Sequence, residues 1–237
     1  MGIVFTGILI CFGLWVIIYP GTDYYNRWYY RDVIRRGNTN GKLIHLSFDD
    51  GPDPRYTPDV LRILNQFRIP ASFFLVGKKV ECHPELARQI CLTGHEIGSH
   101  TYYHQHAYWL FFKKSKETVE KNRVLLSSIM GAPLIWFRPP WGAMNLFEWF
   151  VIKRENLRPV LWTANANDWL TKTKPEMIQS LLVKKVHSGS IILLHDSGGE
   201  PGAPLNTLKA LPGIIRKFQA EGYRFVSLQE ITGGKGQ

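Results

Sequence analysis

The chain has 237 residues, of which 45% are hydrophobic and 20% are charged. This composition excludes an intrinsically disordered protein, and the length suffices for one large domain with a buried core. Three cysteines are too few for a disulfide-stapled miniprotein. The formal net charge of +10 favours anionic partners, but no compact basic motif marks a nucleic-acid-reading element, so we expect no nucleic acid partner.

The chain begins with an apolar segment. Residues 2–19 read GIVFTGILICFGLWVIIY and contain no charged residue. As a helix they are about 27 Å long, close to the hydrocarbon thickness of a thin bilayer. A cleavable signal peptide normally has lysine or arginine before its apolar run and small residues at a cut site, and this segment has neither. We therefore expect an uncleaved transmembrane anchor over residues 1–22, in a single-pass protein of the cell membrane.

The residues after this segment carry two membrane signals that point in different directions. Aromatic residues gather as they do at a membrane interface: Trp15, Tyr19, Tyr24, Tyr25, Trp28, Tyr29 and Tyr30. Four arginines follow the apolar run, at positions 27, 31, 35 and 36. The positive-inside rule therefore predicts a cytoplasmic body, whereas the function considered below favours the outer side.

A predicted linker over residues 23–41 ends in a polar hinge, GNTNG, and strand-like and helix-like patterns alternate after it. Seven strands are predicted at residues 43–48, 71–76, 96–98, 134–137, 158–162, 190–194 and 224–227. Six helices are predicted at residues 58–67, 84–92, 116–130, 146–154, 175–186 and 206–220. Their alternation predicts one α/β domain with a parallel sheet over residues 42–232, followed by a frayed tail over residues 233–237. The pattern alone allows a closed barrel or an open doubly wound sheet.

Side chains able to carry chemistry come directly after the predicted strands. Asp49 and Asp50 follow the first strand, His100 and His104 the third, Arg138 the fourth, Asn165 and Asp168 the fifth, and His195 and Asp196 the sixth. The carboxyl ends of parallel strands meet at one rim, where α/β folds build their sites. The sequence therefore predicts that five separate segments converge on one active site.

Two histidines and a carboxylate form a usual ligand set for catalytic zinc. His100 and His104 are four residues apart, which on a helical turn places both imidazoles on one face. On an extended backbone, Asp49 and Asp50 point in opposite directions and can take different tasks. An aspartate-rich turn in water and ordinary core histidines are the alternatives. His95 and His106 are not expected to bind the ion.

Two further motifs complete the predicted site. Arg138 precedes Pro-Pro-Trp-Gly, and its guanidinium can hold a carboxylate bidentately and keep it ionised. Trp141 is either a wall for sugar stacking or an ordinary core residue. His195 ends an apolar strand near a carboxylate, an environment that can tune an imidazole to donate a proton near neutral pH.

The motifs SFDDGP, HTYYH, RPPWG, NANDW and LLHD occur in this order between residues 47 and 196. Together they resemble the motifs of the polysaccharide deacetylase family, also called the NodB-homology domain or carbohydrate esterase family 4. The resemblance spans about residues 42–231. It implies the family fold, a distorted (β/α) barrel often with seven strands. The expected fold class is thus α/β, a distorted (β/α)7 barrel of NodB-homology type preceded by one transmembrane helix.

The resemblance also implies residue roles. Asp49 is implied as the catalytic base, Arg138 as the residue that orients it, and His195 as the general acid. The implied metal ligands are Asp50, His100 and His104, with zinc the expected divalent ion and cobalt, manganese or nickel as alternatives. Leu193 is implied as a wall of the acyl pocket, and the backbone N–H of Trp141 as an oxyanion partner.

One position departs from the family pattern. The fourth motif usually begins with an aspartate that supports the acid histidine, and here Asn165 stands at that position. An amide carries no charge to stabilise imidazolium. Asp168 or another acid could substitute, and we count Asn165 and Asp168, with Trp141 and Leu193, among the expected substrate-binding residues.

The resemblance predicts a metal-dependent hydrolase that removes N-acetyl groups from N-acetylglucosamine-containing glycans, peptidoglycan or a chitin-like polymer, on the extracytoplasmic side. One alternative is a deacetylase or deformylase of a lipid-linked amino sugar at the inner face. Another is a catalytically silent glycan- or lipid-binding domain, which Asn165 alone favours. Residues 108–114 read YWLFFKK, which is either core or a loop that dips into the membrane beside the site.

Overall fold

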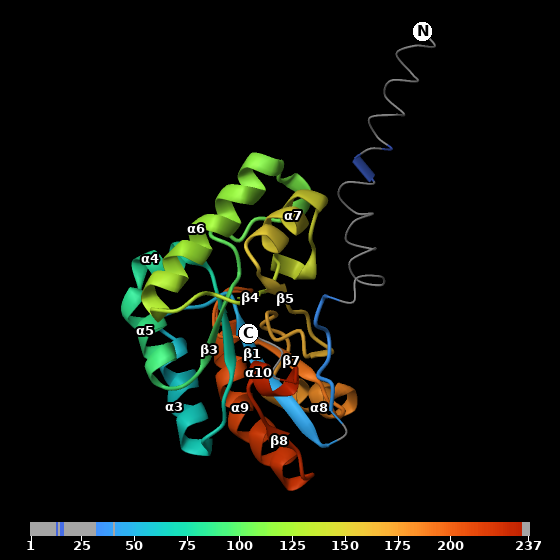
Figure 1. The fold of residues 1–237 in the computed structure, drawn as a ribbon. Coiled ribbons are helices and arrows are strands. Elements are labelled where there is room, and N and C mark those ends of the chain that lie inside the picture. The colour runs from blue at the N-terminus through green and yellow to red at the C-terminus, as the bar shows by residue number, and fades with distance from the viewer. Residues whose placement is uncertain (1–12, 14, 17–31, 40, 234–237) are drawn as a thin grey trace.

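A curled sheet of parallel strands forms the centre of the protein (Figure 1). The structure is a computed structural model that describes residues 13, 15, 16, 32–39 and 41–233. The strands pair in the order β5-β4-β3-β2-β1-β7-β6, and β8 pairs with β1. Their bounds are β1 Leu43–Asp49, β2 Ser72–Leu75, β3 Glu96–Ser99, β4 Trp136–Phe137, β5 Arg158–Pro159, β6 Ala164–Asn165, β7 Ile191–His195 and β8 Arg224–Phe225.

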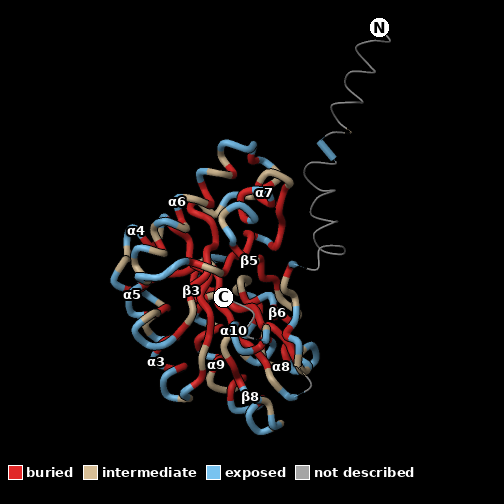
Figure 2. Tube along the Cα trace, viewed as in Figure 1, coloured by how far each residue is buried: buried red, intermediate tan, exposed pale blue. Residues whose placement is uncertain are grey.

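Helices connect most of the strands and cover the sheet (Figure 1). They are α3 Thr57–Phe67, α4 Gly77–Cys82, α5 Pro84–Leu92, α6 Phe112–Met130, α7 Leu146–Arg154, α8 Pro175–Lys185, α9 Ala203–Ala220 and α10 Leu228–Ile231, with short 3-10 turns η2 Ala107–Trp109 and η3 Pro140–Gly142. Four of them, α3, α5, α8 and α9, have proline in the first turn, where its missing N–H costs no helical hydrogen bond. Figure 2 shows buried residues along the strands and on the inner sides of the helices.

The side chains of β1 alternate between two environments, as a strand period of two requires. Ile44, Leu46 and Phe48 belong to the main hydrophobic core beneath the helices. Ser47 and Asp49 are also buried, but both contact the guanidinium of Arg138. One face of the sheet is therefore apolar and packed, and the other carries polar groups toward the site.

The predicted seven-stranded barrel is corrected to a curled, incomplete one. Within the described residues no pairing joins β5 to β6, which are the two ends of the strand path. Residues of the predicted linker lie between these two sides of the sheet: Ile34 forms a parallel bridge with Val160, and Arg36 forms an antiparallel bridge with Ser190. The Gly37 N–H also donates to the Gly189 carbonyl at 2.8 Å. Residues 34–37 of the linker are thus bonded to the ends of β5 and β7 and to Gly189 just before β7.

All seven predicted strands are present, although β4, β5 and β8 are each only two residues long. Strand β6 and helices α4 and α10 were not predicted, because segments of two to six residues show no periodicity. The predicted anchor over residues 1–22 lies almost wholly outside the described residues. In the part of the chain that is described, no helix combines the length and apolarity needed to cross a membrane.

Asn122 on α6 fixes the strand ends that lead into the site. Its buried Nδ2 lies 2.9 Å from each of three acceptors, which are the carbonyls of Leu75 and Thr101 and the hydroxyl oxygen of Ser99. These contacts join the ends of β2 and β3 to the segment that carries His100. A single side chain of α6 therefore stabilises two adjacent strand ends.

We expect Asn122→Ala to lower the free energy of unfolding by about 2 kcal/mol, because buried hydrogen bonds are lost without replacement. Chemical denaturation of the purified chain measures this change. Ser128→Ala is the control, because the Ser128 hydroxyl is exposed on the same helix, and it should change the free energy by less than about 0.5 kcal/mol. Equal losses for the two variants would contradict the role given to Asn122.

Candidate active site

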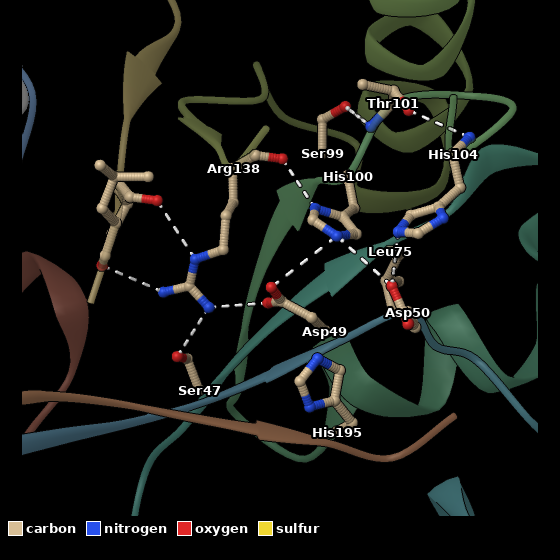
Figure 3. Close-up of polar contacts among 12 residues, drawn as sticks. Ser47, Asp49, Asp50, Leu75, Ser99, His100, Thr101, His104, Arg138 and His195 are labelled. Carbon is tan, nitrogen blue, oxygen red and sulfur yellow. Dashed lines mark hydrogen bonds and ion pairs between the residues drawn. The ribbon is translucent and has the colours of Figure 1, made fainter. Parts of the chain in front are cut away.

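The three predicted metal ligands lie together at the carboxyl end of the sheet (Figure 3). Asp50 Oδ1 is 2.9 Å from His104 Nε2 and 3.4 Å from His100 Nε2. One ligand atom from each residue falls within 4.8 Å of the others. The set is tight enough, and of the right donor types, to hold one divalent cation.

The backbone that carries these ligands differs from the expected helical turn. His100 and His104 lie on a loop after β3, and both Thr101 and His104 have positive φ angles, 61° and 52°. Asp50 also has a positive φ of 70°, directly after β1. Non-glycine residues adopt this left-handed region rarely and at a cost, most often where function requires it. This loop, and not the helical turn that the spacing predicted, brings the two imidazoles together.

Neighbouring groups orient the candidate ligands. The Nδ1 atom of His100 lies 2.7 Å from the Arg138 carbonyl oxygen, so Nδ1 carries the proton and Nε2 faces Asp50. The Lys79 ammonium donates to the Asp50 carbonyl at 2.7 Å and to the Ser197 hydroxyl at 2.8 Å. The first contact orients the His100 side chain, and the contacts of Lys79 hold the main-chain carbonyl of Asp50.

The electrostatics of Asp50 suit a ligand. Burial acts to raise the pKa of Asp50, but hydrogen bonds from His100 and His104, together with their charges, hold it well below its usual value. An ionised carboxylate facing two imidazole Nε2 atoms matches the donors of a divalent-metal site. The residues present therefore fit the expected ion.

Arg138 and Asp49 form a buried ion pair beside the candidate metal site. Arg138 is fully buried, and its Nη1 donates to Asp49 Oδ1 at 2.7 Å and to the Ser47 hydroxyl at 2.9 Å. The remaining guanidinium contacts go to the carbonyls of Val160 and Leu161. The predicted bidentate grip is thus a single-nitrogen contact. It leaves Asp49 Oδ2 on the side of His100, whose Nε2 is 3.8 Å away.

His195 is supported by Asp168. Asp168 Oδ1 lies 3.0 Å from His195 Nδ1. Asp168 Oδ2 accepts hydrogen bonds from the backbone N–H of His195 at 2.7 Å and from the Thr207 hydroxyl at 2.8 Å. Burial acts to lower the pKa of His195, but the charge and hydrogen bond of Asp168, with the charges of Asp50 and Asp49, raise it to about 9. The imidazole is therefore held in its protonated form near neutral pH.

The structure gives the supporting position to Asp168, one of the acids that the sequence left open as a substitute for Asn165. Asp168 is fully buried against His195, which is the position of a supporting acid rather than of a substrate-binding residue. The backbone carbonyl of Asn165, on β6, accepts a hydrogen bond from Lys185 instead. The sequence left open which acid would support His195, and the turn after β6 delivers Asp168, the fourth residue of NANDW. Asn165, the residue that alone favoured a catalytically silent domain, therefore no longer supports that alternative.

A cavity of about 410 Å³ opens onto these groups. Leu193 lines it, and its aromatic walls are Trp141, Trp162 and Trp169. Trp141 is 54% exposed and its ring lies 4.6 Å from that of His104, which excludes the core-packing alternative. Trp162 and Trp169 were missed as site residues, although Trp169 directly follows the Asp168 of the NANDW motif. The walls offer flat apolar faces on which sugar rings can stack.

A second cavity of about 660 Å³ adjoins the first. Asp50, His104 and Gly199 line both cavities, so the two form one groove that passes the candidate metal site. The second part is lined by Lys78, Lys79, His83 and Tyr103, and by Arg55 together with its ion-pair partner Asp53. The groove is thus aromatic on one side of the site and basic on the other.

His95, His106 and Asp196 lie outside the cluster of Asp50, His100 and His104. His95 is buried and accepts a hydrogen bond from the Ala71 N–H. The His106 ring packs 5.1 Å from that of Trp141. Asp196, which the sequence places at the rim, is buried and accepts a hydrogen bond from the Thr57 hydroxyl at 2.5 Å.

We expect Asp168→Asn to move the alkaline limb of the kcat/KM profile to lower pH by about one to two units. The carboxylate that raises the pKa of His195 is lost, so the protonated imidazole disappears at a lower pH. A pH series of acetate release from a glycan measures the shift. Asn165→Asp is the matched control and should leave the limb in place. A shift in the control and none in Asp168→Asn would identify residue 165 as the supporting position.

Comparisons with known proteins agree with this geometry. The family model described as polysaccharide deacetylase matches residues 36–160. A peptidoglycan-N-acetylglucosamine deacetylase of Bacillus cereus is 37% identical over 81% of this chain and 89% of its own length. A chitooligosaccharide deacetylase of Azorhizobium caulinodans is 33% identical over 78% of this chain and 91% of its own.

A similar fold has been solved experimentally. The structure of the peptidoglycan N-acetylglucosamine deacetylase Bc1960 with a bound N-oxidanyl-benzamide ligand superposes with a TM-score of 0.79. The match covers 84% of this chain and 92% of that one, at 29% sequence identity. The curled parallel sheet is therefore shared with a solved enzyme over most of both chains.

Proposed function

Because the chain belongs to the polysaccharide deacetylase family, and is thus a carbohydrate N-deacetylase, we propose that it removes N-acetyl groups from the N-acetylglucosamine residues of peptidoglycan with the help of a divalent metal ion. The observation that carries the proposal is the cluster of Asp50, His100 and His104 beside the Asp49–Arg138 and His195–Asp168 pairs. These groups supply one ion site, one base and one acid around a single cavity.

The ion would be held by Asp50, His100 and His104. When bound, it supplies Lewis-acid polarisation of the amide carbonyl and acidifies a water molecule. Zinc is the proposed ion, with cobalt, manganese or nickel as alternatives, because nitrogen and carboxylate ligands suit all four. The orientation of His100 by the Arg138 carbonyl keeps Nε2 directed at the site.

Asp49 is proposed as the general base. Its Oδ1 is held by Arg138, which leaves Oδ2 to accept the proton of a water that attacks the acyl carbon. His195 is proposed as the general acid, since Asp168 holds its Nδ1 and leaves Nε2 to protonate the departing sugar amine. The pKa of about 9 keeps this proton available at neutral pH.

The proposed oxyanion partner is the backbone N–H of Trp141. The η3 turn gives Trp141 a φ of 57°, and hydrogen bonds from the Gly142 and Ala143 N–H groups hold this turn. Within the described residues, no acceptor is recorded for the Trp141 N–H. A hydrogen-bond donor that the fold already holds in position stabilises developing negative charge without reorganisation.

The shape of the groove supports a polymeric substrate. A single sugar ring would leave most of the joined cavities, of about 410 and 660 Å³, unfilled. Stacking on Trp141, Trp162 or Trp169 would orient the ring that carries the acetamide, and neighbouring residues would extend into the basic part. Peptidoglycan is preferred over chitin-like oligomers because that part can accept its carboxylate groups.

We further propose that residues 1–22 anchor the protein in the cell membrane, with the catalytic domain outside, where cell-wall glycans lie. The support is the uncharged apolar run over residues 2–19. The second candidate is hydrolysis of an N-acyl group on a lipid-linked amino sugar at the inner face. The arginines at positions 27, 31, 35 and 36 favour that side.

Chelation is expected to abolish acetate release, and adding back zinc, cobalt, manganese or nickel should restore it. We expect Asp50→Asn to lower both bound metal and activity by at least about tenfold, because a charged ligand becomes a neutral amide. Metal analysis and acetate release from peptidoglycan and chito-oligomers measure the two quantities. Asp59→Asn, an exposed change on α3, is the control and should alter neither. Full turnover by metal-free protein would refute the proposal.

A further inference from the structure

Four aromatic side chains are unusually exposed on one part of the surface. Trp109 is 76% exposed, Phe111 74%, Phe150 58% and Phe112 46%. We call these four residues the aromatic face. They come from η2, the start of α6 and the middle of α7. Large apolar side chains clustered in this way usually mark an interaction surface, because exposing them to water is unfavourable.

The parts of the aromatic face lie side by side. Helices α6 and α7 pack against each other (Figure 1). The Phe112 ring is 6.1 Å from that of Phe147, in an edge-to-face arrangement. Phe150 follows Phe147 by three residues and so lies on the same side of α7. The face therefore spans two helices rather than one loop, which extends the loop of residues 108–114 singled out in the sequence.

The position of the preceding chain indicates what covers this face. Asp32, the first residue of the continuous described part, forms an ion pair with Lys153 on α7. Lys153 lies one turn after Phe150, on the same side of the helix. The sequence directly before Asp32 contains Trp28, Tyr29 and Tyr30, and at most about 15 Å of extended chain separates Trp28 from Asp32. The aromatic face is thus close to the point where the apolar N-terminal part joins the domain.

The charges around the face fit a lipid surface. Lys113 is exposed between Phe112 and Lys114, and in the described part of the chain its ammonium has no recorded partner. Lys114 pairs with Glu117 and lies 4.0 Å from the ring of Tyr103. Aromatic rings flanked by lysine are typical of surfaces that insert to headgroup depth and attract anionic lipids.

We infer that the aromatic face docks on the surface of an anionic phospholipid bilayer. The inference rests on the proposed membrane anchor but not on the proposed chemistry. Trp109, Phe111, Phe112 and Phe150 enter the headgroup region, and Lys113 contacts anionic headgroups. Together with the N-terminal segment, the face gives the domain a second attachment and hence one orientation.

This orientation brings the catalytic cavity near the lipid. The η2 turn begins three residues after His104, and the His106 ring packs on Trp141, which lines the cavity. The short connection leaves no room for a long spacer between the docked surface and the aromatic side of the groove. Glycan strands lying against the membrane are therefore the ones the cavity meets.

The test uses the full chain in vesicles of phosphatidylcholine and phosphatidylglycerol that contain a photoactivatable diazirine phospholipid. Mass spectrometry maps the labelled peptides. Labelling is expected at residues 109–112 and 147–150, as well as in residues 1–31. The exposed apolar Leu92, at the end of α5, serves as the internal reference and should stay unlabelled.

Two kinds of variant sharpen the test. Trp109→Ser with Phe112→Ser should lower labelling of the face by roughly tenfold while residues 1–31 stay labelled. Lys113→Glu should lower it in anionic vesicles without removing any aromatic ring. Leu92→Ser is the matched control and should change nothing. Deacetylation of a soluble chito-oligomer checks that each variant is folded.

Three results would overturn the inference. Labelling confined to residues 1–31 would mean that the face points away from the bilayer, although the anchor is real. Labelling of neither segment would remove the anchor and the docking together. A change of oligomeric state in detergent caused by Trp109→Ser with Phe112→Ser would identify the face as a contact between copies of the chain. Loss of activity with labelling intact would instead count only against the proposed chemistry.

Discussion

The buried guanidinium of Arg138 is the interaction on which the site depends. It is fully buried, with its carbon atom 3.9 Å from the centre of the Phe74 ring, and only ionic and hydrogen-bonding partners can offset the cost of placing a charge there. Asp49 supplies the opposite charge, and the carbonyls after β5 take the remaining donors. Because the backbone carbonyl of the same residue orients His100, one position links the base to the ligand set.

The two adjacent carboxylates divide their tasks through the backbone. Asp49 is the last residue of β1 and points toward Arg138, whereas Asp50 adopts a left-handed conformation and points toward the two imidazoles. Two further carboxylates near the site, which are far apart in the chain, also have different contacts. Asp196 accepts a buried hydrogen bond from Thr57, and Asp168 contacts His195 from the turn after β6. The task of each carboxylate at this site therefore depends on where the backbone directs its side chain, because the residue type is the same.

Much of this arrangement could be predicted from the sequence. The strand ends, the histidine pair and Arg138 follow from periodicity and from the rule that parallel strands present their carboxyl ends at one edge. The sequence named Asp168 only as one possible support of His195, because residues 164–168 form a two-residue strand and a turn whose direction no pattern reveals. The histidine loop was placed on a helical turn because spacing alone does not report the positive φ angles of Thr101 and His104. The gap between β5 and β6 was missed because it depends on long-range pairing.

Ile34 and Arg36 bridge to residues on opposite sides of this gap, and that has a mechanical consequence. In the proposed anchored protein, the free linker between the anchor and the domain would end near residue 32 and not at the polar hinge near residue 41. The free linker would thereby be shorter by nine residues, or about 30 Å of extended chain. If the proposed anchor holds residues 1–22 in a bilayer, a pull on the linker would act at the gap between β5 and β6, and the domain would be kept within a thinner layer next to that bilayer.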